Sequence, residues 1–116
     1  MRIYMTDHRT KEATKRVKKV LRGLGVEIKH TKCLDLTVRM LGFNDHKAFV
    51  VRDLNAPLSP LDHELSDVEF AERDTFQMYI LAAAGLGAVA RELLDRANPT
   101  GQWHRQQPGN AEESED

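Results

Sequence analysis

The sequence predicts an all-α protein with a three-helix N-terminal module, a C-terminal helical hairpin and a disordered acidic tail. Apolar residues recur at steps of three and four, as expected for helices that bury one face. Capping residues and glycine or proline stops separate these segments. The one extended stretch, residues 26–28, is too short to predict a sheet. At 116 residues, the chain is long enough for one domain with a real core.

The N-terminal module is expected over residues 8–53. Its first helix covers residues 8–22, with Thr6 or Asp7 as the cap. Its apolar stripe consists of Ala13, Val17, Val20, Leu21 and Leu24. The second helix covers residues 31–41, and the Thr31 hydroxyl is expected to cap it. Gly42 ends this helix, because the position after a helix often needs a positive φ.

The third helix of the module is expected over residues 45–52. Asn44 is its predicted cap, and Phe49 and Val50 are expected to point inward. Residues 54–65 contain Pro57 and Pro60, which interrupt regular structure, so this segment is predicted to be a hinge.

The helical hairpin is expected over residues 66–97. Ser66 and Glu69 have the spacing of a capping box at the start of a helix that runs to about residue 84. Its apolar side chains predict the centre of the core there: Phe70, Phe76, Met78, Tyr79, Ile80 and Leu81. Residues 88–97 form the last helix. Residues 1–99 are therefore interpreted as a single helical domain, and residues 100–116, rich in polar and acidic residues, as a disordered tail.

Residues 30–46 carry the one family resemblance of the chain. They resemble the short helical module at the start of glyoxalase-related proteins, in which a His-Ser/Thr-x-x-Leu-Glu/Asp helix precedes Gly-Phe/Tyr-x-Asp-Trp. The matching residues are His30, Thr31, Leu34, Asp35, Leu41, Gly42, Phe43 and Asp45. Val38 replaces the usual small residue, and His46 stands in place of the tryptophan. The resemblance covers about residues 8–50 and implies a helical fold for that part of the chain. It implies no lyase activity, because the 66 residues after Val50 are too few for the βαβββ units of a glyoxalase.

Charge is distributed unevenly along the chain. Residues 1–32 contain ten Lys and Arg against three Asp and Glu, whereas residues 33–116 contain seven against fifteen. This asymmetry indicates either a polyanion-binding end or mutual attraction of the two halves, within one molecule or across a dimer. Four basic residues of the first helix follow one another along the face opposite the apolar stripe: Lys11, Lys15, Lys18 and Arg22. Arg16 and Lys19 flank them, and the six together predict a nucleic-acid-binding or acidic-protein-binding surface. The alternative interpretation is an ordinary solvated helix face.

Small residues are concentrated in the C-terminal hairpin, between residues 82 and 90. Small side chains allow helices to approach closely, so Ala83 and Gly87 are candidate interface residues for a protein–protein adaptor or a homodimer. Trp103 is a third candidate, either as an anchor for a partner or folded back onto the domain.

Catalytic and metal-binding patterns were not found. The five histidines have no metal-ligand spacing with one another or with Cys33. His30 is interpreted as a residue of a helix-cap region, and Cys33 as a small buried hydrophobe. We therefore predict a non-enzymatic binding protein with no metal, no cofactor and no membrane span. The single cysteine and the absence of a signal-like N-terminus predict a cytoplasmic protein, of bacterial type.

Overall fold

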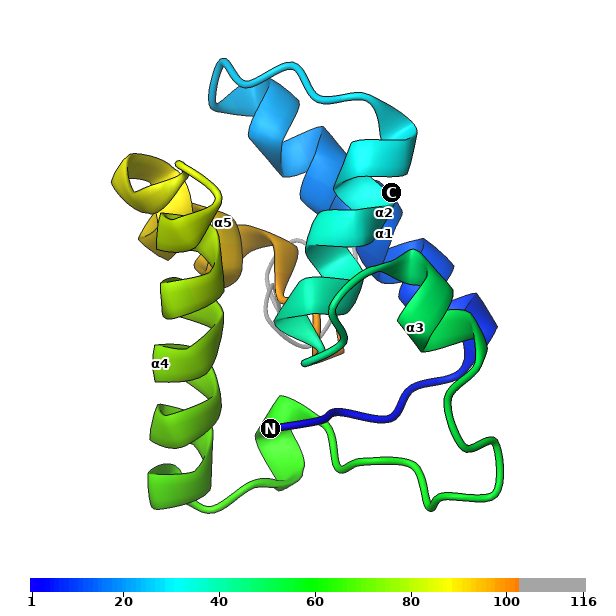
Figure 1. Ribbon diagram of the computed structural model, residues 1–116. Helices are drawn as coiled ribbons and strands as arrows, with labels where there is room; N and C mark the ends of the chain where they lie inside the picture. Colours follow the sequence, from blue (N-terminus) through cyan, green and yellow to red (C-terminus); the bar gives the residue numbers. More distant parts are fainter. Residues whose placement is uncertain (103–116) are drawn as a thin grey trace, which may run out of the picture.

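The computed structural model describes residues 1–102 and confirms the all-α fold class. Five α-helices are present in this part of the chain, with no strand (Figure 1). They are α1 (Asp7–Gly23), α2 (His30–Met40), α3 (His46–Val50), α4 (Asp67–Ala83) and α5 (Ala90–Ala97), accompanied by the 3-10 turns η1 (Asp62–Glu64) and η2 (Gly87–Val89). Among these helices, none combines the length and the apolar character that crossing a membrane requires.

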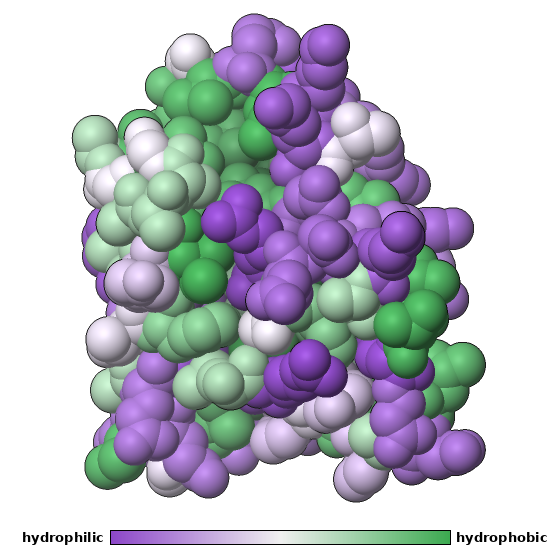
Figure 2. Space-filling model, viewed as in Figure 1, coloured by the Kyte–Doolittle hydropathy of each residue, from purple (hydrophilic) through white to green (hydrophobic). Residues whose placement is uncertain are grey.

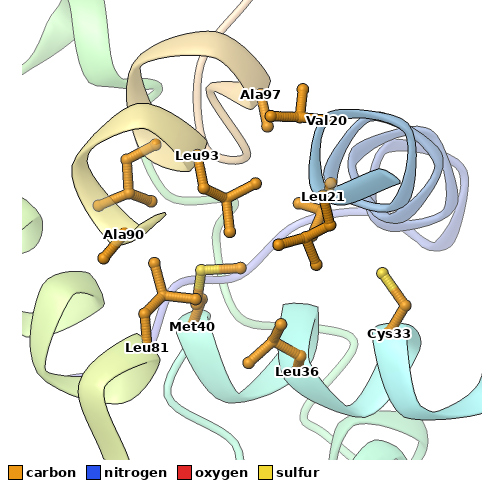
Figure 3. Packing of buried hydrophobic residues seen from close by; sticks show 11 residues of the cluster. Val20, Leu21, Cys33, Leu36, Met40, Leu81, Ala90, Leu93 and Ala97 are labelled. Atoms are coloured by element: carbon orange, nitrogen blue, oxygen red, sulfur yellow. The ribbon is translucent and has the colours of Figure 1, made fainter. Parts of the chain in front are cut away.

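The helices pack around α1 and α2, which lie against each other at the centre of the molecule. α5 contacts α1, and α4 contacts both α2 and α5 at the side of the molecule (Figure 1). The first half and the second half of the chain therefore share one main core. In Figure 3, side chains from four helices point toward one another, among them Leu21, Leu36, Leu81 and Leu93.

The prediction that α4 forms the centre of this core was wrong. Leu81 is the apolar side chain of α4 that becomes fully buried, and Phe70 and Tyr79 are exposed. α4 carries apolar residues on most of its circumference, but α2 and α5 cover one face of it. A helix at the edge of a fold cannot bury every apolar residue that it carries.

A second apolar cluster holds the N-terminal segment, whose burial was not predicted from the sequence. Ile3 and Met5 are buried, and the Ile3 amide donates to the Leu41 carbonyl at 2.7 Å. The ring of Phe43 packs edge-on against Phe49, with ring centroids 5.4 Å apart. This cluster joins the segment before α1 to the corner between α2 and α3.

Two predicted caps were wrong by one or two residues. α2 begins at His30, because the Lys29 backbone is still extended. Lys29 is the cap residue and makes no side-chain bond to the helix, since an ammonium group has no acceptor. Thr31 is therefore inside the first turn. α3 is capped by Asp45 rather than Asn44, because the Asp45 carboxylate accepts from the Ala48 amide at 2.8 Å.

The predicted third helix was also too long at its C-terminus. α3 ends at Val50, and Val50 is exposed rather than inward. A helix of five residues presents one narrow face to the core, and Phe49 occupies it. The Arg52 guanidinium then turns back to donate to the Phe49 carbonyl at 2.9 Å.

The capping box at the start of α4 has the predicted pairing. The Ser66 hydroxyl accepts from the Glu69 amide at 3.1 Å, and the Glu69 carboxylate accepts from the Ser66 amide at 3.0 Å. At the other end of the hairpin, the helix expected over residues 88–97 is split into η2 and α5.

Thr100 was assigned to the tail by the sequence, and this was wrong. It is buried, and its hydroxyl donates to Asp62 at 2.8 Å, so the folded part of the chain extends past residue 99. Residues 103–116 lie outside the described residues, and with them the rest of the predicted tail.

Candidate functional site

The basic face of α1 is the first candidate surface. The buried residues of α1, such as Val17 and Leu21, occupy one side of the helix. Lys11, Lys15 and Lys19 follow at intervals of four on the other side and are exposed. A helix of 17 residues is about 25 Å long, so these cations span several turns of accessible surface.

Arg22 continues this row at the C-terminal end of α1, and Lys18 borders it. Arg22 is exposed and lies 3.7 Å from Glu27, whereas Lys15 lies 3.4 Å from Glu12. Such pairs at a solvent-exposed surface are weak, roughly 0–1 kcal/mol each. Lys18 is half-buried, beside Cys33. We call the set Lys11, Lys15, Lys18, Lys19 and Arg22 the basic stripe.

The acidic half of the chain does not neutralise the basic stripe within the part that the structure describes. The ion pairs of the stripe there involve Glu12 and Glu27, which both belong to the basic first 32 residues. Within residues 1–102, the interpretation in which the acidic half pairs with the basic stripe therefore finds no ion pair. α1 does pair with the second half through Asp7, whose carboxylate lies 2.9 Å from the Arg52 guanidinium.

Arg16 does not belong to the stripe, although the sequence placed it there. Its guanidinium donates to the carbonyls of Ala97 and Asn98, at 2.9 and 3.1 Å. These carbonyls end α5, where a positive charge also opposes the negative end of the helix dipole. Burial lowers the pKa of Arg16 from its ordinary value, and Glu12 acts in the opposite direction. Arg16 thus ties α5 to α1.

The predicted interface residues of the hairpin lie at the C-terminal end of α4 and just beyond it. Ala83 ends α4 and is exposed, and Gly87 begins η2 and is also exposed. Trp103 lies outside the described residues. Ala83 and Gly87 are thus accessible on the surface of the hairpin.

Cys33 is packed in the core as predicted, without a catalytic neighbour in the described structure. It has no exposed surface, and burial raises the pKa of its thiol from 9.0 to about 11. The nearby charge of Lys18 and a hydrogen bond with Thr37 have smaller effects in the opposite direction. A thiol of this kind is protonated at neutral pH and is a poor nucleophile. His30 is exposed at the start of α2.

Potential metal ligands do not gather in residues 1–102. No group of three or more His, Cys, Asp and Glu side chains there has the arrangement to hold a metal ion.

Sequence reasoning missed a buried polar network that holds α4 in place. The Arg73 guanidinium donates to Asp62 at 3.0 Å and to the Pro60 carbonyl at 2.9 Å. Thr100 donates to the same Asp62 oxygen, and Gln77 donates to the Thr100 hydroxyl at 3.2 Å. We call Asp62, Arg73, Gln77 and Thr100 the polar latch. It joins η1, α4 and the segment after α5, and no motif marks it because its members are far apart in the sequence.

Comparison of the chain with protein-family models, with curated proteins and with solved structures gave no match. The resemblance of residues 8–50 to the module of glyoxalase-related proteins therefore stays a prediction.

Proposed function

We propose that this chain is a non-enzymatic binding protein that contacts nucleic acid through the basic stripe of α1. The observation that carries the proposal is the exposure of Lys11, Lys15, Lys19 and Arg22 along one helix. Their partners in the described structure are Glu12 and Glu27, which form long contacts at the surface. Several accessible cations in a row neutralise successive phosphates and release the ions bound to them.

The fold supports this use of α1 because it holds the helix rigidly. Val17, Val20 and Leu21 are buried against α2 and α5, and Arg16 is bonded to the end of α5. The cations are therefore presented on a helix whose opposite face is fixed. Contacts to phosphates set affinity and position but do not read sequence, so binding without strong sequence preference is expected.

Titration of labelled duplex DNA and of labelled RNA, followed by fluorescence anisotropy, tests the proposal. Binding is expected at low salt, about 50 mM, and should weaken steeply as salt is added. The variant Lys15→Gln/Lys19→Gln should reduce the slope of log K against log salt by about 1.8 on duplex DNA, since two phosphate contacts are lost.

The matched control is the variant Lys47→Gln/Arg96→Gln, which removes two exposed cations outside the stripe. It has the same net charge as the stripe variant. Because neither of its cations belongs to the basic stripe, it should leave the slope of log K against log salt close to that of the native chain. Equal loss in the two variants would assign binding to overall charge and not to α1. Undetectable binding of both nucleic acids at low salt would end the proposal.

A further inference from the structure

α4 has an exposed apolar face that no element of the described structure covers. Val68 and Tyr79 are each 68% exposed, although both are large apolar or aromatic residues. With Glu72, Thr75 and Ala82 they follow one another at alternating steps of four and three, so they lie in one line along the helix. This line runs opposite the side on which Arg73, Gln77 and Leu81 are buried.

Phe76 and Ala83 widen this line on the side that faces α2. Phe76 is half-buried, and Ala83 is exposed. Large apolar or aromatic side chains exposed on one helix face, here Val68 and Tyr79, are a usual sign of a binding surface. The small side chains near the end of α4 allow another helix to approach closely.

A groove of about 290 Å³ continues the apolar surface beyond the end of α4. Its apolar lining comes from α2, from the turn after α1 and from the segment after α4: Val26, Ile28, Leu36, Ala84 and Leu86. Its charged rim is Lys32, Arg39 and Glu27, of which Glu27 already faces Arg22. In Figure 2, hydrophobic residues gather at the upper left, over the end of α4 and the turn that follows α1.

Charge divides this surface into two unlike ends. The first two turns of α4 carry Asp67, Glu69 and Glu72, all exposed. The other end, beside Ala84, carries Lys32 and Arg39 of α2. Within residues 1–102, neither of these two cations nor Glu72 forms an ion pair.

We infer that this face binds a second copy of the chain, with the two α4 helices antiparallel about a two-fold axis near Thr75. A two-fold axis pairs each surface patch with itself, so the patch must be self-complementary. A face that is acidic at one end and basic at the other, with Thr75 and Tyr79 between the two ends, meets this condition when it is reversed. The charge pattern selects a second copy over a nucleic acid, which the acidic end would repel.

The antiparallel arrangement also matches large residues with small ones. With the axis near Thr75, Val68 faces Ala82 of the second copy, and Glu72 lies between Tyr79 and Arg39 of the second copy. The acidic start of each α4 then lies beside Lys32 and Arg39 of the other copy. The two helix dipoles run in opposite directions, which further favours this orientation. The inference is independent of nucleic-acid binding by α1.

Sedimentation equilibrium of the full chain, from low micromolar to the highest soluble concentration, tests the inference. A concentration-dependent dimer is expected. The variants Arg39→Glu and Glu72→Arg each place like charges opposite one another at both ends of the interface. Each should weaken self-association at least roughly tenfold, since like charges placed opposite one another across an interface repel.

A mixture of the two single variants is the decisive sample. In a mixed dimer, one copy is negative at both positions and the other is positive at both, so all the contacts become attractive. The mixture should therefore form a heterodimer about as tight as the native dimer. Mixing can restore association only if the two reversed charges contact each other between copies. Lys47→Glu, an exposed charge reversal on α3, is the control and should leave association unchanged.

Three results would overturn the inference. A monomer at every concentration would show that this face does not bind a second copy. A dimer that both single variants leave intact, or a mixture that stays monomeric, would reject the antiparallel pairing. Equal weakening by Lys47→Glu would show a general effect of charge. Circular dichroism of each variant shows whether its helices are intact, and the mixing experiment uses variants that are folded by this measure.

Discussion

Removal of the Arg73 guanidinium is the sharpest test of how α4 is held. Arg73 and Asp62 have 8% and 10% of their side-chain surface exposed, and their charged groups are 3.0 Å apart. In Arg73→Met, Asp62 keeps the hydroxyl of Thr100 as a donor but loses its counter-charge, and the Pro60 carbonyl loses its Arg73 donor. Removing one partner of a buried ion pair costs about 3–5 kcal/mol of the free energy of unfolding. The free energy of unfolding of a domain is about 5–15 kcal/mol, so a large part of it would be lost.

Urea unfolding followed by circular dichroism measures this loss. With a slope of about 1.5 kcal/mol per M, the midpoint of Arg73→Met should fall by about 2–3 M. Arg91→Met is the matched control. Arg91 also binds a carboxylate, Asp74, at 2.6 Å, but its side chain is half exposed. Hydrogen bonds that Arg91 donates to the Asp74 carboxylate raise the pKa of Arg91, yet removal of a pair at the surface should cost about 1 kcal/mol or less.

A second variant distinguishes the cost of the unpaired Asp62 charge from the cost of the hydrogen bonds lost with Arg73. Asp62→Asn in the Arg73→Met background removes the unpaired negative charge while the amide oxygen still accepts from Thr100. It should recover part of the lost free energy of unfolding. If Arg73→Met costs no more than Arg91→Met, the polar latch is open to water and the reasoning fails.

Two further predictions concern single positions, Gly42 and Cys33. Gly42 has φ +93°, and a Cβ there would lie 1.8 Å from the Met1 carbonyl oxygen, whereas Gly25 has φ +86° with no atom within 4 Å. Urea unfolding should therefore show a larger loss in the free energy of unfolding for Gly42→Ala than for Gly25→Ala. Gly25→Ala should cost about 1–2 kcal/mol, from the unfavourable backbone conformation alone. Equal losses would show that the N-terminal segment is not docked. The folded Cys33 thiol should titrate near its raised pKa of about 11, against 9.0 when unfolded. The protonated thiol therefore makes its full contribution to the free energy of unfolding below pH 9, and this contribution is lost as the pH rises through 11. Thiolate absorbance with and without urea measures both midpoints, and coincident midpoints would contradict burial.

The predictable part of the fold came from patterns that lie within one helix. The stripe of Val17, Val20 and Leu21 and the capping box of Ser66 and Glu69 involve residues three or four apart. A helix brings such residues together by its own geometry, whatever it packs against. The caps of α2 and α3 were less predictable because several polar residues stand next to one another there, and backbone conformation chose among them.

The candidate surfaces were predictable to the same extent. The exposure of Lys11, Lys15 and Arg22 follows from their spacing, because they lie opposite the apolar side of α1. Lys18 was expected in the same row but is half-buried. Arg16 could not be separated from these residues, because its partners at Ala97 and Asn98 are 81 and 82 residues away. The exposed face of α4 could not be identified either, because its sequence is apolar on most sides.

The sequence by itself determined that the chain is helical, roughly where each helix begins and ends, and that α1 has one cationic side. These properties depend on interactions between near neighbours in the chain. Tertiary structure alone decided that α4 lies at the edge, that Arg73 is buried and that Arg16 holds α5. Each of these outcomes depends on which helix faces are covered, and coverage is set by contacts between segments that are distant in the sequence.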